Sequence, residues 1–165
     1  MGNCGELCNF VSKLQIAPRS DMRFIGTIEA KVDNKGRVFV PASFRRILGE
    51  DTSLVLRLTA DPGYAKLYPV SEWEKINEEL KSKLNLWNKK DQAVYRQFTA
   101  MAENIELDVN GRMLLSKKNL EALGVDGDVV FAGVGDYIEL WSRDRFEATM
   151  LDEGDLEAAL EDIMK

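Results

Sequence analysis

Apolar and polar residues alternate along "FIGTIEAKV" at residues 24–32. Period-two alternation with β-branched and aromatic residues is typical of a strand. The next residues, "DNKG", favour a turn, and "RVFV" predicts a return strand, so a β-hairpin is expected here. Pro41 ends the ladder and suits the first turn of a short helix, "ASFRRIL", with Gly49 as its C-cap. "SLVLRL" and "AKLYPV" then predict two further strands.

The same order of elements returns later in the chain. Residues spaced by 75 positions match at Asp33 and Asp108, Gly36 and Gly111, Arg37 and Arg112, Leu48 and Leu123, Gly49 and Gly124, and Val55 and Val130. Matches that stay in register over such a length indicate an internal duplication. Because one such unit is too small to close a core alone, we expect two units to pack together into one barrel-like α+β core.

The segment between the two units is predicted to be helical. Apolar residues recur at three- and four-residue steps at Trp73, Ile76, Leu80, Leu84 and Trp87, which predicts an amphipathic helix with its aromatic residues packed in the core. Ser71 followed by Glu74 is a candidate capping box. "QAVYRQFTAMA" predicts a second helix, and the chain after Trp141 is predicted to be helical with a weak point at Gly154.

Charge is distributed unevenly along the 165 residues. The formal net charge is −6, which taken alone argues against nucleic acid. Residues 30–58, however, carry six basic and three acidic residues, whereas residues 150–165 carry one basic and six acidic residues. The basic excess therefore surrounds the first "DNKGR", and most of the acidity lies in the tail.

Several function classes lose support from the residue inventory. The chain has no histidine, no G-x-x-x-x-G-K phosphate loop and no cluster of metal ligands, so we expect no enzyme activity, no metal and no cofactor. Cys4 and Cys8 are interpreted as incidental thiols, and Glu6 stands where an acylation signal needs Ser or Thr. No apolar run is long enough to span a bilayer, and no signal peptide is visible, so a cytoplasmic protein is expected.

Longer stretches of the chain resemble one known family. "MRFIGTIEAKVDNKGRVFVPASFR", "LYPVSEWEKI", "YRQFTAMAENIELDVNGR" and "GVGDYIELWSRDRFE" are similar, in this order, to segments of the MraZ family of bacterial transcriptional regulators. The resemblance covers about residues 22–148. It implies tandem AbrB-like units in a swapped-hairpin β-barrel with peripheral helices, assembled as an octamer-like homo-oligomeric ring. It also implies nucleoid-associated binding to short direct repeats of double-stranded DNA upstream of the protein's own division and cell-wall operon.

The resemblance and the repeat together give a division of the chain. We expect an N-terminal extension without fixed order at 1–21, a first unit at 22–70, a helical connector at 71–102, a second unit at 103–148 and an acidic helical tail at 149–165.

The family's Asp-x-Lys-Gly-Arg stretch falls on Asp33, Lys35, Gly36 and Arg37. The predicted DNA-binding residues are Asn34, Lys35, Gly36, Arg37, Arg45, Asn110 and Arg112. A Gly turn lets the backbone approach a phosphate, Lys and Arg supply charge, and Arg can read guanine in the major groove. The alternative is a plain hairpin turn in which Asp33 binds its own backbone and Arg37 pairs with a carboxylate.

The second copy departs from the first. Asn110 replaces the lysine, and Ser116 stands where the family often has Pro, although Lys117 and Lys118 follow. We therefore expect the first copy to carry most of the DNA contact. A protein-interaction module of the antitoxin type, without a specific DNA target of its own, stays open as the alternative function. No membrane partner and no small-molecule substrate are expected.

Overall fold

The computed structural model describes residues 24–60 and 63–165. The first unit consists of β1 (Thr27–Lys31), β2 (Arg37–Phe39), α2 (Ala42–Leu48), β3 (Ser53–Leu58) and β4 (Ala65–Pro69). Two helices follow, α3 (Val70–Lys83) and α4 (Lys89–Ala100). The second unit consists of β5 (Ala102–Glu106), β6 (Arg112–Leu114), α5 (Lys117–Leu123), β7 (Asp128–Gly133), β8 (Ile138–Ser142) and α6 (Arg143–Thr149), and α7 (Glu153–Ile163) comes after it. The predicted order of elements is thus found in both units.

The two units exchange strands. Six strands form an antiparallel sheet in the order β1-β7-β8-β4-β3-β5, so the first strand of each unit lies beside the third strand of the other unit. β1 pairs with β7 through Thr27 to Ala132 and Lys31 to Asp128, and β5 pairs with β3 in the same manner. The α+β class is confirmed. The sheet has two edges, β1 and β5, and among the described residues no closed barrel is seen.

A second, smaller sheet joins the two hairpins. β2 pairs antiparallel with β6, with Val38 opposite Met113. Both of these residues are buried, together with Phe24, Phe44 and Phe131. The Phe24 and Phe44 rings meet edge to face with centroids 5.6 Å apart. Burial of such a side chain contributes about 1.5–3 kcal/mol, so the shared core holds the two hairpins in one rigid frame.

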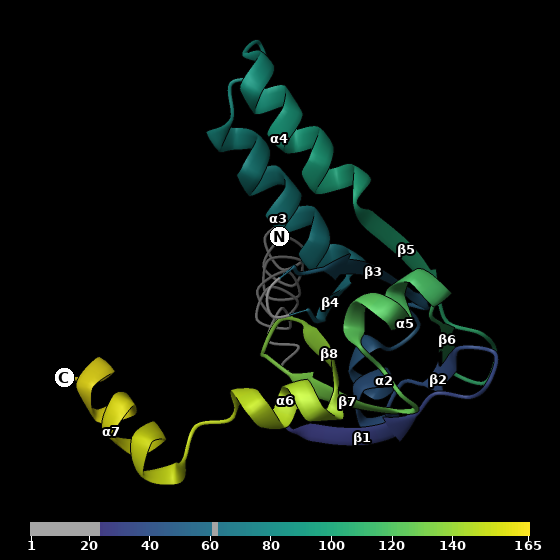
Figure 1. Ribbon diagram of the computed structural model, residues 1–165. Coiled ribbons are helices and arrows are strands. Elements are labelled where there is room, and N and C mark those ends of the chain that lie inside the picture. The colour runs from purple at the N-terminus through teal and green to yellow at the C-terminus, as the bar shows by residue number, and fades with distance from the viewer. Residues whose placement is uncertain (1–23, 61–62) are drawn as a thin grey trace, which may run out of the picture.

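The helices α3 and α4 form a hairpin that projects from the sheet (Figure 1). Trp73 on α3 stacks on Phe98 of α4, with ring centroids 5.0 Å apart, and the Tyr95 hydroxyl donates to Asn77 Oδ1 at 2.9 Å. Neither helix has a buried residue, so the pair is held mainly by these contacts at its base and middle.

Three local predictions are wrong. Trp87 is 94% exposed in the turn between α3 and α4 rather than packed in the core, because the helix ends at Lys83 before the apolar stripe is complete. Pro69 occupies the N-cap of α3, and no side chain caps this helix, so Ser71 and Glu74 form no capping box. The break in the C-terminal helices lies at 150–152, and Gly154 is inside α7.

Some predictions fall on residues that the structure does not describe, and others are confirmed by it. Cys4, Cys8 and the predicted extension at 1–21 lie outside the described residues. Gly49 and Gly124 are the C-caps of α2 and α5, as predicted, and both have a φ of 66°. In the described part of the chain, no helix has the length and apolarity needed to cross a membrane.

Candidate nucleic-acid interface

The first Asp-x-x-Gly-Arg turn is held together by Asp33. Its Oδ1 accepts hydrogen bonds from the backbone N–H groups of Lys35 and Arg37, both at 2.9 Å, and its Oδ2 accepts from Arg37 Nε at 2.9 Å. The backbone closes the same loop, since Gly36 N donates to Asp33 O at 3.0 Å. The motif spacing is therefore the spacing of one side-chain-braced turn, with Asn34 and Lys35 exposed at its tip.

The second turn repeats this geometry. Asp108 Oδ1 accepts from the backbone N–H groups of Asn110 and Arg112 at 2.9 Å, and Oδ2 accepts from Arg112 Nε at 2.8 Å. Gly36 and Gly111 have φ values of 85° and 83°, in the left-handed region that favours glycine. The duplication seen in the sequence is thus a duplication of one backbone conformation.

Each turn packs against the other unit. A Cβ added to Gly36 would lie 2.6 Å from the Leu115 backbone oxygen, and one added to Gly111 would lie 2.4 Å from Arg45 Nη1. The backbone also crosses over: Leu115 N donates to Gly36 O at 2.8 Å and Val40 N donates to Gly111 O at 3.0 Å. The glycines are needed for this close approach, which places the two turns on the one β2–β6 sheet.

Both aspartates are held in the ionised form. The backbone N–H of Arg37 is the main cause that lowers the pKa of Asp33 below its ordinary 3.8, and the Arg37 side chain adds to it. The backbone N–H of Arg112 lowers the pKa of Asp108 in the same way. At neutral pH each carboxylate is therefore available as the acceptor that orients its arginine.

The plain-turn alternative is correct as a description of how each arginine is anchored, yet it leaves most of the guanidinium unused. The bond to Asp33 occupies Nε of Arg37. Among the hydrogen bonds of the described residues, the two terminal NH₂ groups of Arg37 take no part. A pre-oriented guanidinium with free donors is suited to a phosphate or a guanine edge.

The two arginines differ in their surroundings. The guanidinium of Arg112 lies over the Phe39 ring, 5.7 Å from its centroid. The register explains the difference, because Phe39 faces Arg112 across the β2–β6 ladder, whereas Arg37 faces Leu114. The Arg37 side chain is 35% exposed and that of Arg112 is 24% exposed. Arg37 is consequently the more accessible of the two cations.

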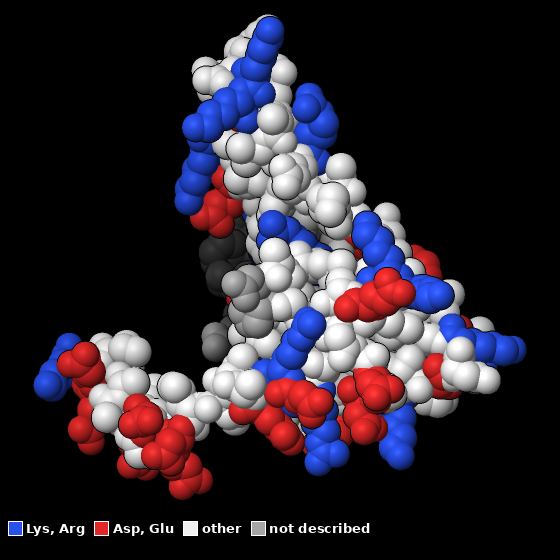
Figure 2. Space-filling view, viewed as in Figure 1, with Lys and Arg blue, Asp and Glu red and all other residues white. Residues whose placement is uncertain are grey.

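The structure brings most of the predicted residues to one edge of the molecule, where the loops before β2 and β6 lie (Figure 1). Basic side chains project at this edge in Figure 2, whereas acidic side chains crowd α7 at the opposite side. Arg45 differs from the rest: its Nε donates to Val40 O at 3.0 Å and its guanidinium covers Gly111. Arg45 therefore braces the second turn from the first unit.

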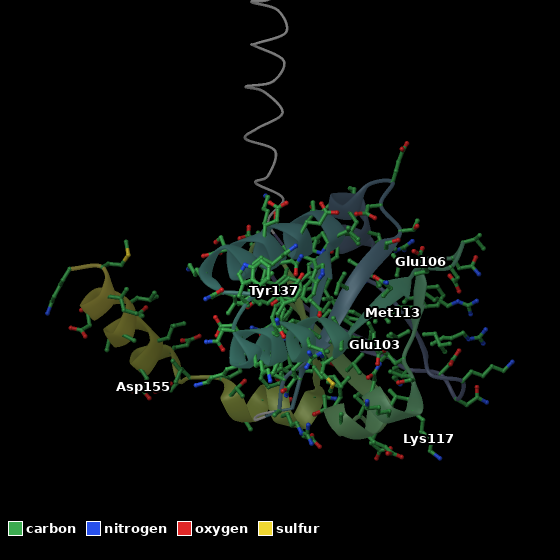
Figure 3. All side chains as sticks on the ribbon, turned by 90° about the horizontal axis from the view of Figure 1, so that it is seen from above. Glu103, Glu106, Met113, Lys117, Tyr137 and Asp155 are labelled. Atoms are coloured by element: carbon green, nitrogen blue, oxygen red, sulfur yellow. The ribbon has the colours of Figure 1, made fainter. Side chains whose placement is uncertain are left out.

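The residues just after β6 also lie at this edge. Lys117 and Lys118 are exposed at the start of α5, and the Lys117 side chain points outward (Figure 3). Ser116 is the N-cap of this helix and accepts from Asn119 N at 3.1 Å. Sequence reasoning missed Phe39, because its contact with Arg112 follows only from the β2–β6 register.

The described residues contain no group of three or more His, Cys, Asp or Glu side chains placed to hold a metal ion. A small cavity of about 190 Å³ lies beside the second turn, lined by Arg45, Asp51 and Asp108 among others. Its walls are mixed in charge and belong to the turn packing already described.

Comparison with known proteins agrees with the duplicated geometry. A family model described as "MraZ protein, putative antitoxin-like" matches twice, at residues 23–97 and 98–162. The chain is 43% identical over 146 residues to a Bacteroides fragilis protein named transcriptional regulator MraZ, which covers 87% of this chain and 92% of the relative. A protein of the same name from Lachnoclostridium phytofermentans is 36% identical over 132 residues, covering 80% and 90%. Matches across both units and most of each sequence establish that the chain belongs to the MraZ family.

Proposed function

We propose that this protein is a sequence-specific DNA-binding regulator of transcription, and that its two Asp-x-x-Gly-Arg turns contact double-stranded DNA. The observation that carries the proposal is Arg37, held through Nε by Asp33 with its terminal NH₂ groups unused within the described chain. Relatives named transcriptional regulators support the same conclusion.

The chemistry of the first turn fits both kinds of DNA contact. The exposed ammonium of Lys35 gives a phosphate contact, which supplies affinity without sequence information. The terminal donors of Arg37 fit O6 and N7 of guanine in the major groove, which a two-stranded ribbon can enter. One turn would therefore supply both the lysine that positions the protein on the phosphates and the arginine that reads a base.

The second turn contributes less in this proposal. Asn110 replaces the lysine, and Arg112 must leave the face of Phe39 before it can reach a base. Lys117 and Lys118 at the start of α5 provide phosphate contacts near this turn. The second copy then mainly steadies the shared ribbon and adds charge.

A single protomer offers few specific contacts, so its binding should be weak. We propose that copies assemble into a ring, which presents the turns repeatedly and raises avidity on direct repeats without new chemistry. The strand pairs β1–β7 and β3–β5 each join one unit to the other, which supports a swapped-hairpin arrangement of the two units. A target upstream of the protein's own division and cell-wall operon, in the nucleoid, completes the proposal.

Fluorescence anisotropy on labelled duplexes tests it. One duplex carries the region upstream of the protein's own gene, and a second has the same composition in scrambled order, each at about 50 and 200 mM salt. Specific binding predicts that the preference for the upstream duplex survives the higher salt, because base contacts release no counterions. Equal binding to both duplexes at both salt concentrations would overturn the proposal.

The alternative is a protein-interaction module, favoured by the exposed Trp87 at the tip of the helical hairpin. It predicts that the pure protein fails to shift its own upstream DNA and that one second protein co-purifies at fixed stoichiometry. The anisotropy experiment separates the two functions, because only the regulator discriminates between the duplexes.

A further inference from the structure

Helix α7 has an apolar stripe with no buried position. Leu156, Leu160 and Ile163 follow the i, i+4, i+7 spacing of one helix face, and all three are exposed. The helix has 11 residues, and helices shorter than about 12–15 residues are marginal in water without tertiary packing. A surface that covers the stripe would supply the missing stabilisation.

The rest of α7 specifies the charge of that surface. The helix carries Glu153, Asp155, Glu157, Glu161 and Asp162, and it has no basic residue between Glu153 and Ile163. Its acidic residues are conspicuous in Figure 2. The complementary surface must therefore combine exposed apolar side chains with a basic surround.

The outer face of α4 has both properties. Val94 on α4 and Met101 at its C-cap are seven residues apart and are 45% and 57% exposed, and Trp87, in the turn before the helix, is 94% exposed. Beside them, a groove of about 560 Å³ runs between α4 and the end of β3, with Leu58 and Phe98 among its lining residues.

Charge and length both match α7. Of the basic residues of α4, Lys90 lies four positions before Val94 and shares its face, and Arg57 lies over the Phe98 ring at 4.5 Å. The 12 residues of α4 extend about 18 Å and the 11 residues of α7 about 16 Å at 1.5 Å per residue. Glu157, three residues before Leu160, flanks the stripe of α7, and an antiparallel arrangement aligns the two helix dipoles favourably.

The two surfaces are far apart within one chain. Figure 1 shows α7 and the α3–α4 hairpin at separate extremities of the molecule. Only residues 150–152 link α6 to α7, and three residues span at most about 11 Å. The surfaces can meet readily between copies, in a head-to-tail contact of the kind that closes into a ring.

We infer that α7 of one copy packs on the Val94–Met101 face of α4 in the next copy and that this contact holds the assembly together. This inference deepens the proposed function and rests on its ring. It assigns the acidic tail a role in assembly, so its acidity need not oppose DNA at the distant β2–β6 edge.

Charge reversal on either side provides the test, with full-length chains in the absence of DNA. The α7 variant is E157K, three residues before Leu160, and the α4 variant is K90E, four residues before Val94. K90E suits the first turn of α4, where Glu is favoured, and E157K places a good helix former in the middle of α7. Arg96→Glu, on the opposite face of α4, is the matched control. Light scattering after size exclusion gives the mass, and circular dichroism checks the fold.

The expected result is a large assembly for the wild type and for the Arg96→Glu control, and a drop toward the monomer mass for each reversed variant alone. An equimolar mixture of the two reversed variants restores the assembly, because each chain then meets a partner of opposite charge on both sides. This rescue requires contact between different chains.

Each other outcome overturns the inference. Reversed variants that keep the wild-type mass show that α7 does not fasten the ring, although the ring itself stands. A third variant carries both reversals in one chain. If this variant assembles and the mixture does not, α7 folds onto the hairpin of its own chain. If neither assembles, these two surfaces do not pair. A monomeric wild type overturns the ring as well, whereas the DNA contact is judged separately by the anisotropy of Arg37→Ala.

Discussion

Replacing Arg37 by Ala provides the sharpest test of the proposed DNA contact. A paired hydrogen bond from arginine to guanine contributes about 1–3 kcal/mol, so loss of one contact lowers the affinity for a single-box duplex about 5- to 150-fold. On a duplex with two boxes, two engaged copies lose the contact, and the loss in free energy about doubles. The bond from Arg37 Nε to Asp33 is also lost, yet Asp33 still accepts from the backbone N–H groups of residues 35 and 37, so the turn keeps its shape.

The matching change at Arg112 has a smaller expected effect. Its guanidinium rests on Phe39, a contact that contributes about 0.5–1 kcal/mol at an exposed site. That amount must be given up before Arg112 binds DNA, so it is subtracted from any gain. We therefore expect Arg112→Ala to lose about half a kcal/mol to one kcal/mol less than Arg37→Ala, which is about a two- to fivefold smaller loss of affinity.

Anisotropy titration with the upstream duplex measures both variants, and Arg96→Ala on α4 controls for the loss of one exposed arginine. Thermal unfolding checks that each variant is folded. If Arg37 reads a base, its loss reduces the preference over the scrambled duplex. If it binds only phosphate, affinity falls equally on both duplexes and the salt slope decreases by about 0.9. Arg37→Ala with wild-type affinity, or a larger loss for Arg112→Ala, would refute the reasoning.

Three further predictions concern stability. Gly36→Ala should lower the stability in thermal unfolding more than Gly26→Ala does. Both glycines have positive φ, which alone costs Ala about 1–2 kcal/mol, but only Gly36 has a backbone oxygen within 2.6 Å of the new Cβ. Equal losses of stability would contradict this packing. Phe131→Ala should lower the free energy of unfolding by about 3–5 kcal/mol in denaturant titration, since this ring is fully buried, and a loss below about 1 kcal/mol would disprove its place in the core. The lowered pKa values of Asp33 and Asp108 add stability that is complete above their ordinary 3.8 and is lost as pH falls through the lowered values; the double Asn variant should therefore be less stable than wild type at neutral pH, and the gap should close in acid.

The duplicated turn could be predicted from sequence because it is local. Asp33, Gly36 and Arg37 interact within five residues, so spacing alone indicates their geometry, and its return at Asp108 indicates a second copy. The C-cap at Gly49 and the strands around it follow from equally local preferences. A conformation that a short segment determines by itself can be predicted from the residues of that segment.

The remaining features depend on distant partners. The pairing of β1 with β7, and of Phe39 with Arg112, joins segments far apart in the chain, and alternation within a strand does not identify its neighbour. Trp87 continued the helical stripe in sequence, but the chain turns after Lys83. Arg45 is predicted from sequence as a DNA-binding cation, and the sequence does not show that its side chain also covers Gly111.

The exchange of strands also constrains how the protein can be made. Glu29 of β1 pairs with Val130 of β7, so the sheet cannot be completed until about 100 further residues have left the ribosome. At about 5–20 residues per second this delay is about 5–20 s, much longer than a hairpin needs to form. During that interval the nascent first unit exposes an unpaired strand edge. Partial chains and truncation products should therefore be the aggregation-prone species.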